Sequence, residues 1–128
     1  SIGNPHGVIF LDYNIDNLDL ASIGPELENH PMWPDRANIE FINIIDSSTI
    51  KMRVWERGSG ETMACGTGAC ASAIAFLKKT DRLGTDRSIV TVRLKGGDLS
   101  ISVNPSNLHI MMTGPAEEVY NATYRRKK

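Results

Sequence analysis

Residues 56–77 read ERGSGETMACGTGACASAIAFL, and this stretch decides the fold that the sequence predicts. Residues 66–77 are small or apolar on nearly every face of a helix, a composition that favours a helix buried in the middle of a domain. A loop with two glycines precedes them, and Cys65 stands directly ahead of the first helical position. The stretch therefore predicts a buried central helix with a thiol at its start.

Short runs of alternating apolar residues on both sides of this helix predict strands around it. An apolar run at 8–11 predicts a buried strand, and a short or irregular helix with Pro25 inside it is expected before residue 30. Residues 39–45 and 50–55 predict a hairpin whose second strand is half-buried, with apolar residues at every other position. Further strands are predicted at 90–94, 99–103, 108–112 and 117–120. Together they favour an α+β class: a curved, mostly antiparallel sheet wrapped around one buried helix.

Composition bounds the class of protein. A chain of 128 residues corresponds to one domain. Four of the fourteen basic residues lie at 125–128, so the rest of the chain has ten basic and fifteen acidic residues, which argues against a nucleic-acid partner. No apolar run approaches the roughly 18 residues of a membrane span, and no signal peptide is visible. Both cysteines lie in one segment, which favours reduced thiols and a cytoplasmic location.

The start of the predicted helix has the chemistry of an anion site. The N–H groups of Gly66, Thr67 and Gly68 are expected to be available to an anion, either carboxylate or phosphate. A thiol at such a position is expected to have a depressed pKa and to act as a base or nucleophile. The alternative is that Cys65 is a small buried residue in a tight turn. Neighbouring Glu56 and Glu61 leave the two readings open.

The other candidates are weaker. Cys70 is predicted to be core packing, and two cysteines without clustered histidines do not make a zinc site. The glycine-rich loop lacks the ending of a nucleotide-binding P-loop. Glu56-Arg57 is either a solvated hairpin end or a polar pair at the mouth of a pocket, since arginine binds carboxylates through two hydrogen bonds.

Two polar positions near predicted strands complete the candidates. Asn4-Pro5-His6 immediately precedes a buried strand, and His6 alone would be a surface histidine. Asn38 opens the next strand and would alone be a turn residue.

The order of motifs resembles one family. The motifs are Gly3-Asn4-Pro5-His6, Ala37-Asn38-Ile39-Glu40-Phe41, the run 53–62, the run 64–71, and Met112-Thr113-Gly114-Pro115-Ala116-Glu117. This pattern is similar to the C-terminal half of diaminopimelate epimerases, amino-acid epimerases that work without pyridoxal phosphate. The resemblance covers essentially the whole chain, and it implies one half of a two-domain, barrel-like fold and no cofactor or metal.

The resemblance also implies a two-cysteine mechanism, in which one thiolate removes the α-proton and a second thiol returns a proton to the opposite face. Cys65 matches one of the two cysteines, and the other belongs to an N-terminal domain that this chain lacks. Glu56 is implied to tune Cys65, and His6 to approach the absent cysteine. Substrate binding is implied for Asn4, Asn38, Glu56, Arg57, Gly66 and Thr67.

These inferences predict an isomerase of lysine biosynthesis that interconverts LL- and meso-diaminopimelate, inactive as the isolated half. Its expected partners are the small-molecule substrate, the N-terminal domain and a second copy in a homodimer, with no nucleic acid and no membrane. Two alternatives remain at this stage: a sister racemase of the same fold, or a non-catalytic module that binds an anion at Gly66. Small departures from the family pattern at Ile2, Gly7 and Ser59 affect none of the implied roles.

Overall fold

The computed structural model describes residues 5–63, 65–86, 88–114 and 118–123. The elements are β1 (His6–Phe10), the 3-10 helix η1 (Ile15–Asn17), α1 (Leu20–Glu28), β2 (Asn38–Asp46), β3 (Thr49–Glu56), β4 (Gly60–Thr62), α2 (Gly66–Lys79), β5 (Ile89–Leu94), β6 (Gly97–Val103), β7 (His109–Thr113) and β8 (Glu118–Thr123). Neither of the two α-helices in this part of the chain is long and apolar enough to cross a membrane.

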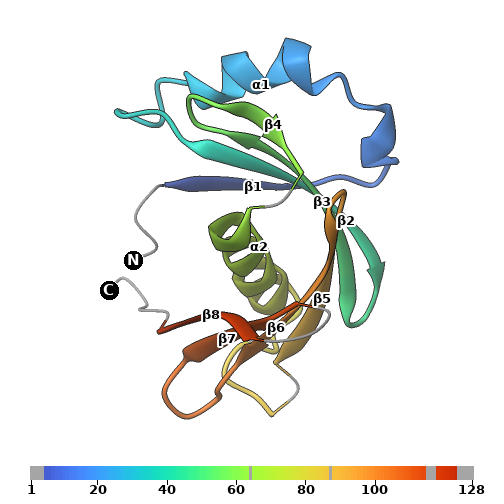
Figure 1. Cartoon of the computed structure of the whole chain (residues 1–128), viewed down its shortest axis with the longest axis vertical. Helices are drawn as coiled ribbons and strands as arrows, with labels where there is room; N and C mark the ends of the chain where they lie inside the picture. Colours follow the sequence, from blue (N-terminus) through green and yellow to red (C-terminus); the bar gives the residue numbers. More distant parts are fainter. Residues whose placement is uncertain (1–4, 64, 87, 115–117, 124–128) are drawn as a thin grey trace.

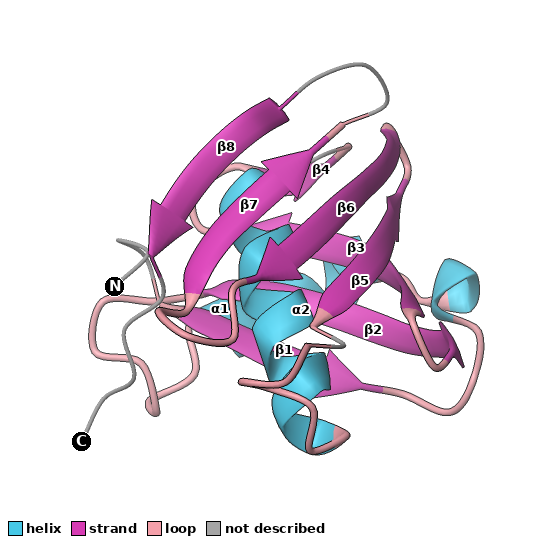
Figure 2. Cartoon of the chain, turned by 90° about the horizontal axis from the view of Figure 1, so that it is seen from below, coloured by secondary structure: helices cyan, strands magenta, loops and turns pink. Residues whose placement is uncertain are grey.

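One eight-stranded sheet curves around α2 (Figure 1). Its order is β1-β2-β3-β5-β6-β7-β8, and β4 pairs with β3 off this path. The β1–β2 and β3–β5 pairs are parallel, and the other pairs in the described residues are antiparallel. The α+β fold with a curved, mostly antiparallel sheet around one helix is therefore confirmed. Seen from below, β5 to β8 form a layer across one side of α2 (Figure 2).

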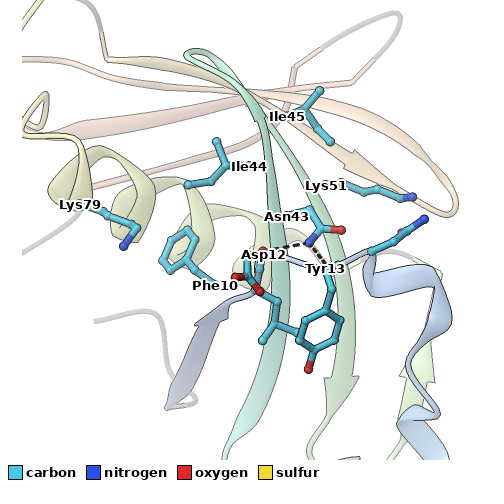
Figure 3. A pocket seen from close by; sticks show the side chains of 10 residues that line it. Phe10, Asp12, Tyr13, Asn43, Ile44, Ile45, Lys51 and Lys79 are labelled. Atoms are coloured by element: carbon cyan, nitrogen blue, oxygen red, sulfur yellow. Dashed lines mark hydrogen bonds between the residues drawn. The ribbon is translucent and has the colours of Figure 1, made fainter.

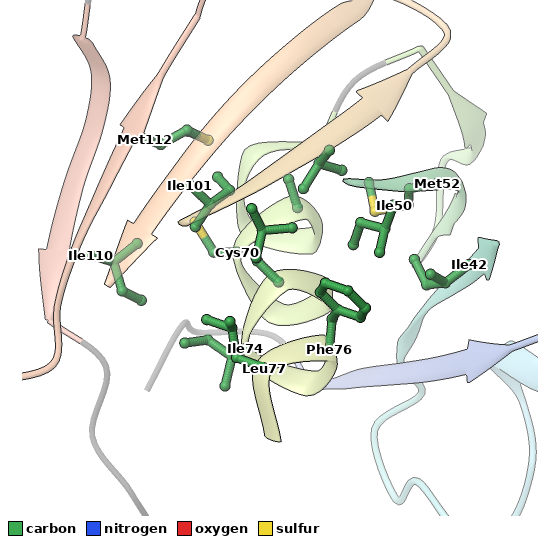
Figure 4. Close-up of a cluster of buried hydrophobic side chains, with 14 of the residues drawn as sticks. Ile42, Ile50, Met52, Cys70, Ile74, Phe76, Leu77, Ile101, Ile110 and Met112 are labelled. Atoms are coloured by element: carbon green, nitrogen blue, oxygen red, sulfur yellow. The ribbon is translucent and has the colours of Figure 1, made fainter. Parts of the chain in front are cut away.

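The main core lies between α2 and the concave face of the sheet (Figure 4). Small residues let the strands approach the helix closely, while Phe76 and Leu77 fill the space near its C-terminal end and are fully buried. Apolar side chains from β3, β5, β6 and β7 complete the cluster, among them Ile50, Val92 and Ile101. The burial of these chains on folding is the main stabilising term for the domain.

A second layer covers the outer face of β2 and β3. Helix α1 and its flanking loops pack there around Ile15, Leu20 and Phe41, and all three side chains are buried. The predicted buried face of residues 50–55 is confirmed, but the opposite face is not open to solvent, because α1 and its flanking loops partly cover it. Arg53, on the α1 side, is only 9% exposed. The alternating pattern predicts that the face of β3 with Arg53 is exposed to solvent. Helix α1, which is distant in the sequence, shields this face from water.

Helix α1 is short, as its proline predicted. Pro25 lies inside it, and Asp19 stands at the N-cap without a capping hydrogen bond from its side chain. Gly24 makes close packing possible, since a Cβ built there would lie 2.3 Å from a ring carbon of Trp55. The helix therefore touches β3 directly at a glycine.

Candidate active site

The register of three strands brings the predicted polar residues together. His6 pairs with Asn38 in the parallel ladder of β1 and β2. Ile39 pairs with Trp55 in the antiparallel ladder of β2 and β3, so Asn38 and Glu56 come next along the two strands. Since side chains alternate across a sheet, His6, Asn38 and Glu56 share the face that looks toward α2.

Cys65 caps the N-terminus of α2. Its Sγ atom accepts a hydrogen bond from the N–H of Gly68 at 3.3 Å and lies 3.6 Å from the hydroxyl of Thr67. The residue is only 7% exposed and makes no disulfide. The thiol is thus fixed by the first turn of the helix, on the side of the site that the three strands face.

Burial raises the pKa of the Cys65 thiol, which contradicts the depressed value expected for a helix start. Hydrogen bonds from Thr67 and Gly68 oppose the shift, whereas the negative charges of Glu56 and Glu40 add to it. Desolvation disfavours the thiolate more than the helix start favours it. The resting form of Cys65 in this chain is therefore the thiol.

The backbone around Cys65 keeps two of the three predicted donors available, because the N–H of Gly68 is bonded to the Cys65 Sγ atom. In the described part of the chain, the N–H groups of Gly66 and Thr67 have no acceptor, as expected for the first two helical positions. Gly66 faces the sheet closely, since a Cβ there would lie 2.9 Å from the methyl carbon of Met112. A carboxylate placed beside Cys65 could accept both hydrogen bonds.

Glu56 and Arg57 lie where β3 turns into β4. The predicted glycine loop is the tight turn of this hairpin, and the Glu56 carboxylate accepts a hydrogen bond from the hydroxyl of Thr62. The Arg57 guanidinium donates to the carbonyl oxygen of Asp35 at 3.0 Å. These hydrogen bonds fix Glu56 and Arg57 in place. The pair is therefore not a freely solvated strand end.

Asn38 is a buried strand residue, only 2% exposed, which overturns its reading as a turn residue. Its Oδ1 atom accepts the backbone N–H of Arg57 at 2.6 Å, so this side chain fixes the start of the hairpin turn. Asn4, the remaining predicted substrate-binding residue, lies outside the described residues.

His6 is not a surface histidine. Its side chain is 7% exposed, and its Nδ1 lies 3.0 and 3.1 Å from the two carboxylate oxygens of Glu40. Glu40 is fully buried, and burial raises the pKa of its carboxyl group against the opposing effect of His6. Sequence reasoning gave Glu40 no role, although an acidic residue inside the apolar run 39–45 is a signal, since buried charges need partners.

A second buried carboxylate supports the hairpin from the α1 side. Glu28 accepts hydrogen bonds from the indole of Trp55 at 2.9 Å, the N–H of Gly58 at 3.0 Å and the guanidinium of Arg36 at 3.1 Å. The bond from Trp55 is the main reason that the pKa of Glu28 is lowered. Sequence reasoning also missed this residue, which ties α1 to the turn that carries Arg57.

Cys70 belongs to the core, as predicted. It is fully buried on α2 against the sheet (Figure 4), and burial raises its pKa to about 11. Among the described residues, no three His, Cys, Asp or Glu side chains are grouped so that they could hold a metal ion.

A broad depression lies at the opposite end of β2 and β3 from Cys65 (Figure 3). Asp12, Tyr13, Lys51 and Lys79 are among the residues that line it, and Asn43 joins its two sides by hydrogen bonds to the carbonyl groups of residues 11 and 13. Its described lining contains neither cysteine nor histidine. The chemistry-bearing side chains are therefore gathered at the start of α2, away from this depression.

Comparisons with known proteins agree on one family. The family model described as diaminopimelate epimerase matches residues 1–119. Curated proteins named diaminopimelate epimerase from Acetivibrio thermocellus and Methanococcus maripaludis are each 51% identical over 120 residues, 94% of this chain. The matches cover 41% and 42% of those relatives, so the chain spans about two fifths of their length.

A solved structure supports the fold. The crystal structure of a Bacillus anthracis phenazine biosynthesis protein of the PhzF family aligns with a TM-score of 0.55 and 24% sequence identity. The alignment covers 88% of this chain and 34% of that one. At this identity the likeness concerns the fold alone.

Proposed function

We propose, because the chain belongs to the diaminopimelate epimerase family, that it forms the C-terminal domain of an enzyme that epimerises LL-diaminopimelate to meso-diaminopimelate. The observation that carries the proposal is the convergence at the start of α2. There Cys65 lies within electrostatic range of Glu56 and Glu40, and His6 is bound to Glu40. We place this activity in cytoplasmic lysine biosynthesis.

Cys65 serves one face of the substrate in this proposal. In one direction its thiol gives a proton to the α-carbon, so the S–H bond breaks as the C–H bond forms. In the other direction its thiolate takes that proton. A cysteine of the N-terminal domain does the converse on the opposite face, and no cofactor is needed because the electrons of the broken C–H bond pass into the substrate carboxylate.

The raised pKa of Cys65 gives it a defined starting role. Because the thiol form is favoured, Cys65 begins as the proton donor when the substrate is deprotonated on its other face. For the reverse direction a thiolate must form, and a bound substrate ammonium group close to the sulfur would favour it. Glu56 acts on the balance between the thiol and thiolate forms of Cys65 through its negative charge, which opposes thiolate formation.

Backbone and side-chain donors bind the substrate. The N–H groups of Gly66 and Thr67 hold the carboxylate at the reacting carbon and stabilise the negative charge that develops there. Asn38, Glu56 and Arg57, together with Asn4, bind the ammonium groups and the distal carboxylate. His6 acts on the thiol of the N-terminal domain.

Conversion of LL- to meso-diaminopimelate in D₂O, with deuterium incorporated at the α-carbon, tests the proposal. The protein is this chain joined behind the N-terminal region of the Acetivibrio thermocellus relative, and the substrates are diaminopimelate and other amino acids. Cys65→Ala is expected to reduce epimerisation by at least about 10³-fold, the scale of a lost acid–base group. Cys70→Ala is the matched control, since that thiol lies in the core.

Three outcomes would contradict the proposal. Full epimerisation by the Cys65→Ala variant would remove Cys65 from the chemistry. Turnover by the 128-residue chain alone at the rate of the joined protein would overturn the division between two domains. Preference for another amino acid would identify a sister racemase.

A further inference from the structure

Glu40 is a buried carboxylate at this site to which the proposed function gives no role. It lies in the middle of the apolar strand β2, fully shielded from water. Both of its carboxylate oxygens lie within hydrogen-bond distance of His6 Nδ1, at 3.1 and 3.0 Å. A charged residue is rarely placed in such surroundings without a partner, and here the partner is His6.

The same carboxylate lies against the first turn of α2. A Cβ built on Gly68 would lie 3.1 Å from the Glu40 Oε2 atom and equally 3.1 Å from the Cys65 Sγ atom. Glycine at this position therefore lets the carboxylate and the thiol approach the helix from two sides. Glu40 is thus bonded to His6 on β1 and lies against the helix turn that holds Cys65. It therefore adjoins both predicted acid–base residues of the chain.

The contact with Glu40 decides the tautomer of the imidazole. In its ionised form the Glu40 carboxylate only accepts hydrogen bonds, and His6 Nδ1 then carries the proton that it donates. The other ring nitrogen, Nε2, is then an acceptor when the imidazole is neutral. Within the described residues Nε2 is buried and has no hydrogen-bond partner. A buried polar atom without a partner is costly, so this nitrogen is arranged for a group that binds there.

We infer that Glu40 is a positioning residue, which holds His6 with Nδ1 protonated and Nε2 ready to accept a proton during the reaction. The inference rests on the proposed function. When Nε2 takes a proton from a thiol, the S–H bond breaks, an N–H bond forms, and the Glu40 carboxylate balances the positive charge of the imidazolium. Glu56 on β3 and the Cys65 thiol on α2 are the other titratable groups that act on this pair.

Nitrogen NMR of the histidine rings tests the tautomer without any assay of activity. In the ¹⁵N-labelled chain, which has three histidines, the His6 signals are assigned by their loss in His6→Asn. The wild-type chain is expected to show a protonated Nδ1 and an unprotonated Nε2. Glu40→Gln is expected to yield a mixture of tautomers, because an amide both donates and accepts. Glu61→Gln, a carboxylate paired elsewhere, is expected to leave the signals unchanged.

Kinetics of the joined protein separate this inference from the proposed function. Glu40→Gln is expected to lower kcat about 10²-fold with little change in KM, as for loss of a correctly oriented base. Glu40→Asp, which keeps the charge but shortens the side chain, should recover only part of the loss. If Cys65→Ala is inactive while Glu40→Gln retains kcat within about twofold, the inference fails and the proposed function stands.

Two further results would decide the matter. An unprotonated Nδ1 in the wild-type chain would overturn the inference whatever the activity measurements give. If Cys65→Ala is fully active but the His6 tautomer depends on Glu40 as expected, the proposed function fails and only the Glu40–His6 arrangement is retained.

Discussion

Buried charged side chains lie on both faces of β2 and β3, and the two groups differ in how well they are paired. On the α1 side, Arg53 binds Glu61 through two hydrogen bonds of 2.8 and 2.9 Å and also donates to the carbonyl oxygens of Ile15 and Leu18. On the α2 side, Glu40 has His6 as its partner, and His6 keeps a buried nitrogen without one.

The pKa values follow this difference. On the α1 side, the Arg53 hydrogen bond holds the pKa of Glu61 below its usual value, with Lys95 adding to the effect. On the α2 side, burial raises the pKa of Glu40 and of Cys65. A fully paired network stabilises a fold, whereas buried groups short of partners are typical of a site prepared for a ligand or a proton transfer.

The largest expected effect on stability is the loss of Arg53. Arg53→Met should lower the free energy of unfolding by about 3 kcal/mol, because it leaves two backbone carbonyls without their donor and leaves Glu61 with Lys95 alone. Urea denaturation measures the change. Arg93→Met, an exposed arginine on β5, serves as the control and should alter stability by less than about 0.5 kcal/mol. Equal effects of the two variants would contradict the comparison.

The same glycine substitution should act differently on the two faces. Gly24→Ala on α1 is expected to cost about 2 kcal/mol, because the new methyl group would lie 2.3 Å from a Trp55 ring carbon and the helix must shift. Gly68→Ala on α2 meets its neighbours at 3.1 Å, so a gain in helix propensity of about 1 kcal/mol offsets much of its cost. Thermal unfolding of both variants shows which one is less stable. A Gly68→Ala variant less stable than Gly24→Ala would contradict the prediction.

Removing the Glu61 charge should have a moderate effect that depends on pH. Glu61→Gln is expected to lower the free energy of unfolding by about 1.5 kcal/mol at neutral pH, the scale of a charged hydrogen bond. Because the folded pKa lies below the ordinary 4.5, the stabilisation is present above pH 4.5 and is lost as the pH falls through the folded value. Urea denaturation curves of the variant and the wild type should therefore differ at neutral pH and converge at acidic pH.

Glu40→Gln should change stability least, by less than about 1 kcal/mol at neutral pH, because a neutral isostere replaces a poorly solvated charge. The contribution of Glu40 to stability changes with pH in the opposite direction to that of Glu61. The folded pKa lies above 4.5, so the wild type loses stability as the pH rises from 4.5 through that value, and the variant does not. A loss above about 2 kcal/mol, measured by the same urea titration, would place Glu40 in the stabilising group instead.

Much of the fold could be predicted because its elements follow local rules. Alternation located the strands around α2, and the small-residue run located the buried helix with Cys65 at its start. The burial of Arg53 could not be predicted, because it depends on η1 and α1 folding over a face that alternation alone assigns to solvent. Local periodicity contains no information about such distant coverage.

The site was only partly predictable for a similar reason. The sequence pattern singled out His6, Asn38, Glu56 and Cys65, and the resemblance implied their roles. Glu40 has its role only through the β1–β2 register and the closeness of Gly68. The pKa of Cys65 was predicted in the wrong direction, because the sequence shows the helix start and does not show how deeply the thiol is buried. Desolvation is a property of the packed domain.

The two parallel strand pairs have a consequence for the order in which the domain folds. Each pair is closed by a long connection, through α1 for β1–β2 and through α2 for β3–β5, whereas the β2–β3 hairpin closes through a two-residue turn. Loop closure slows distant pairings, so we expect the hairpin to form early and β1 and α2 to dock late. His6 and Cys65 would then reach Glu40 in the last step, and low φ-values at their contacts with it would test this.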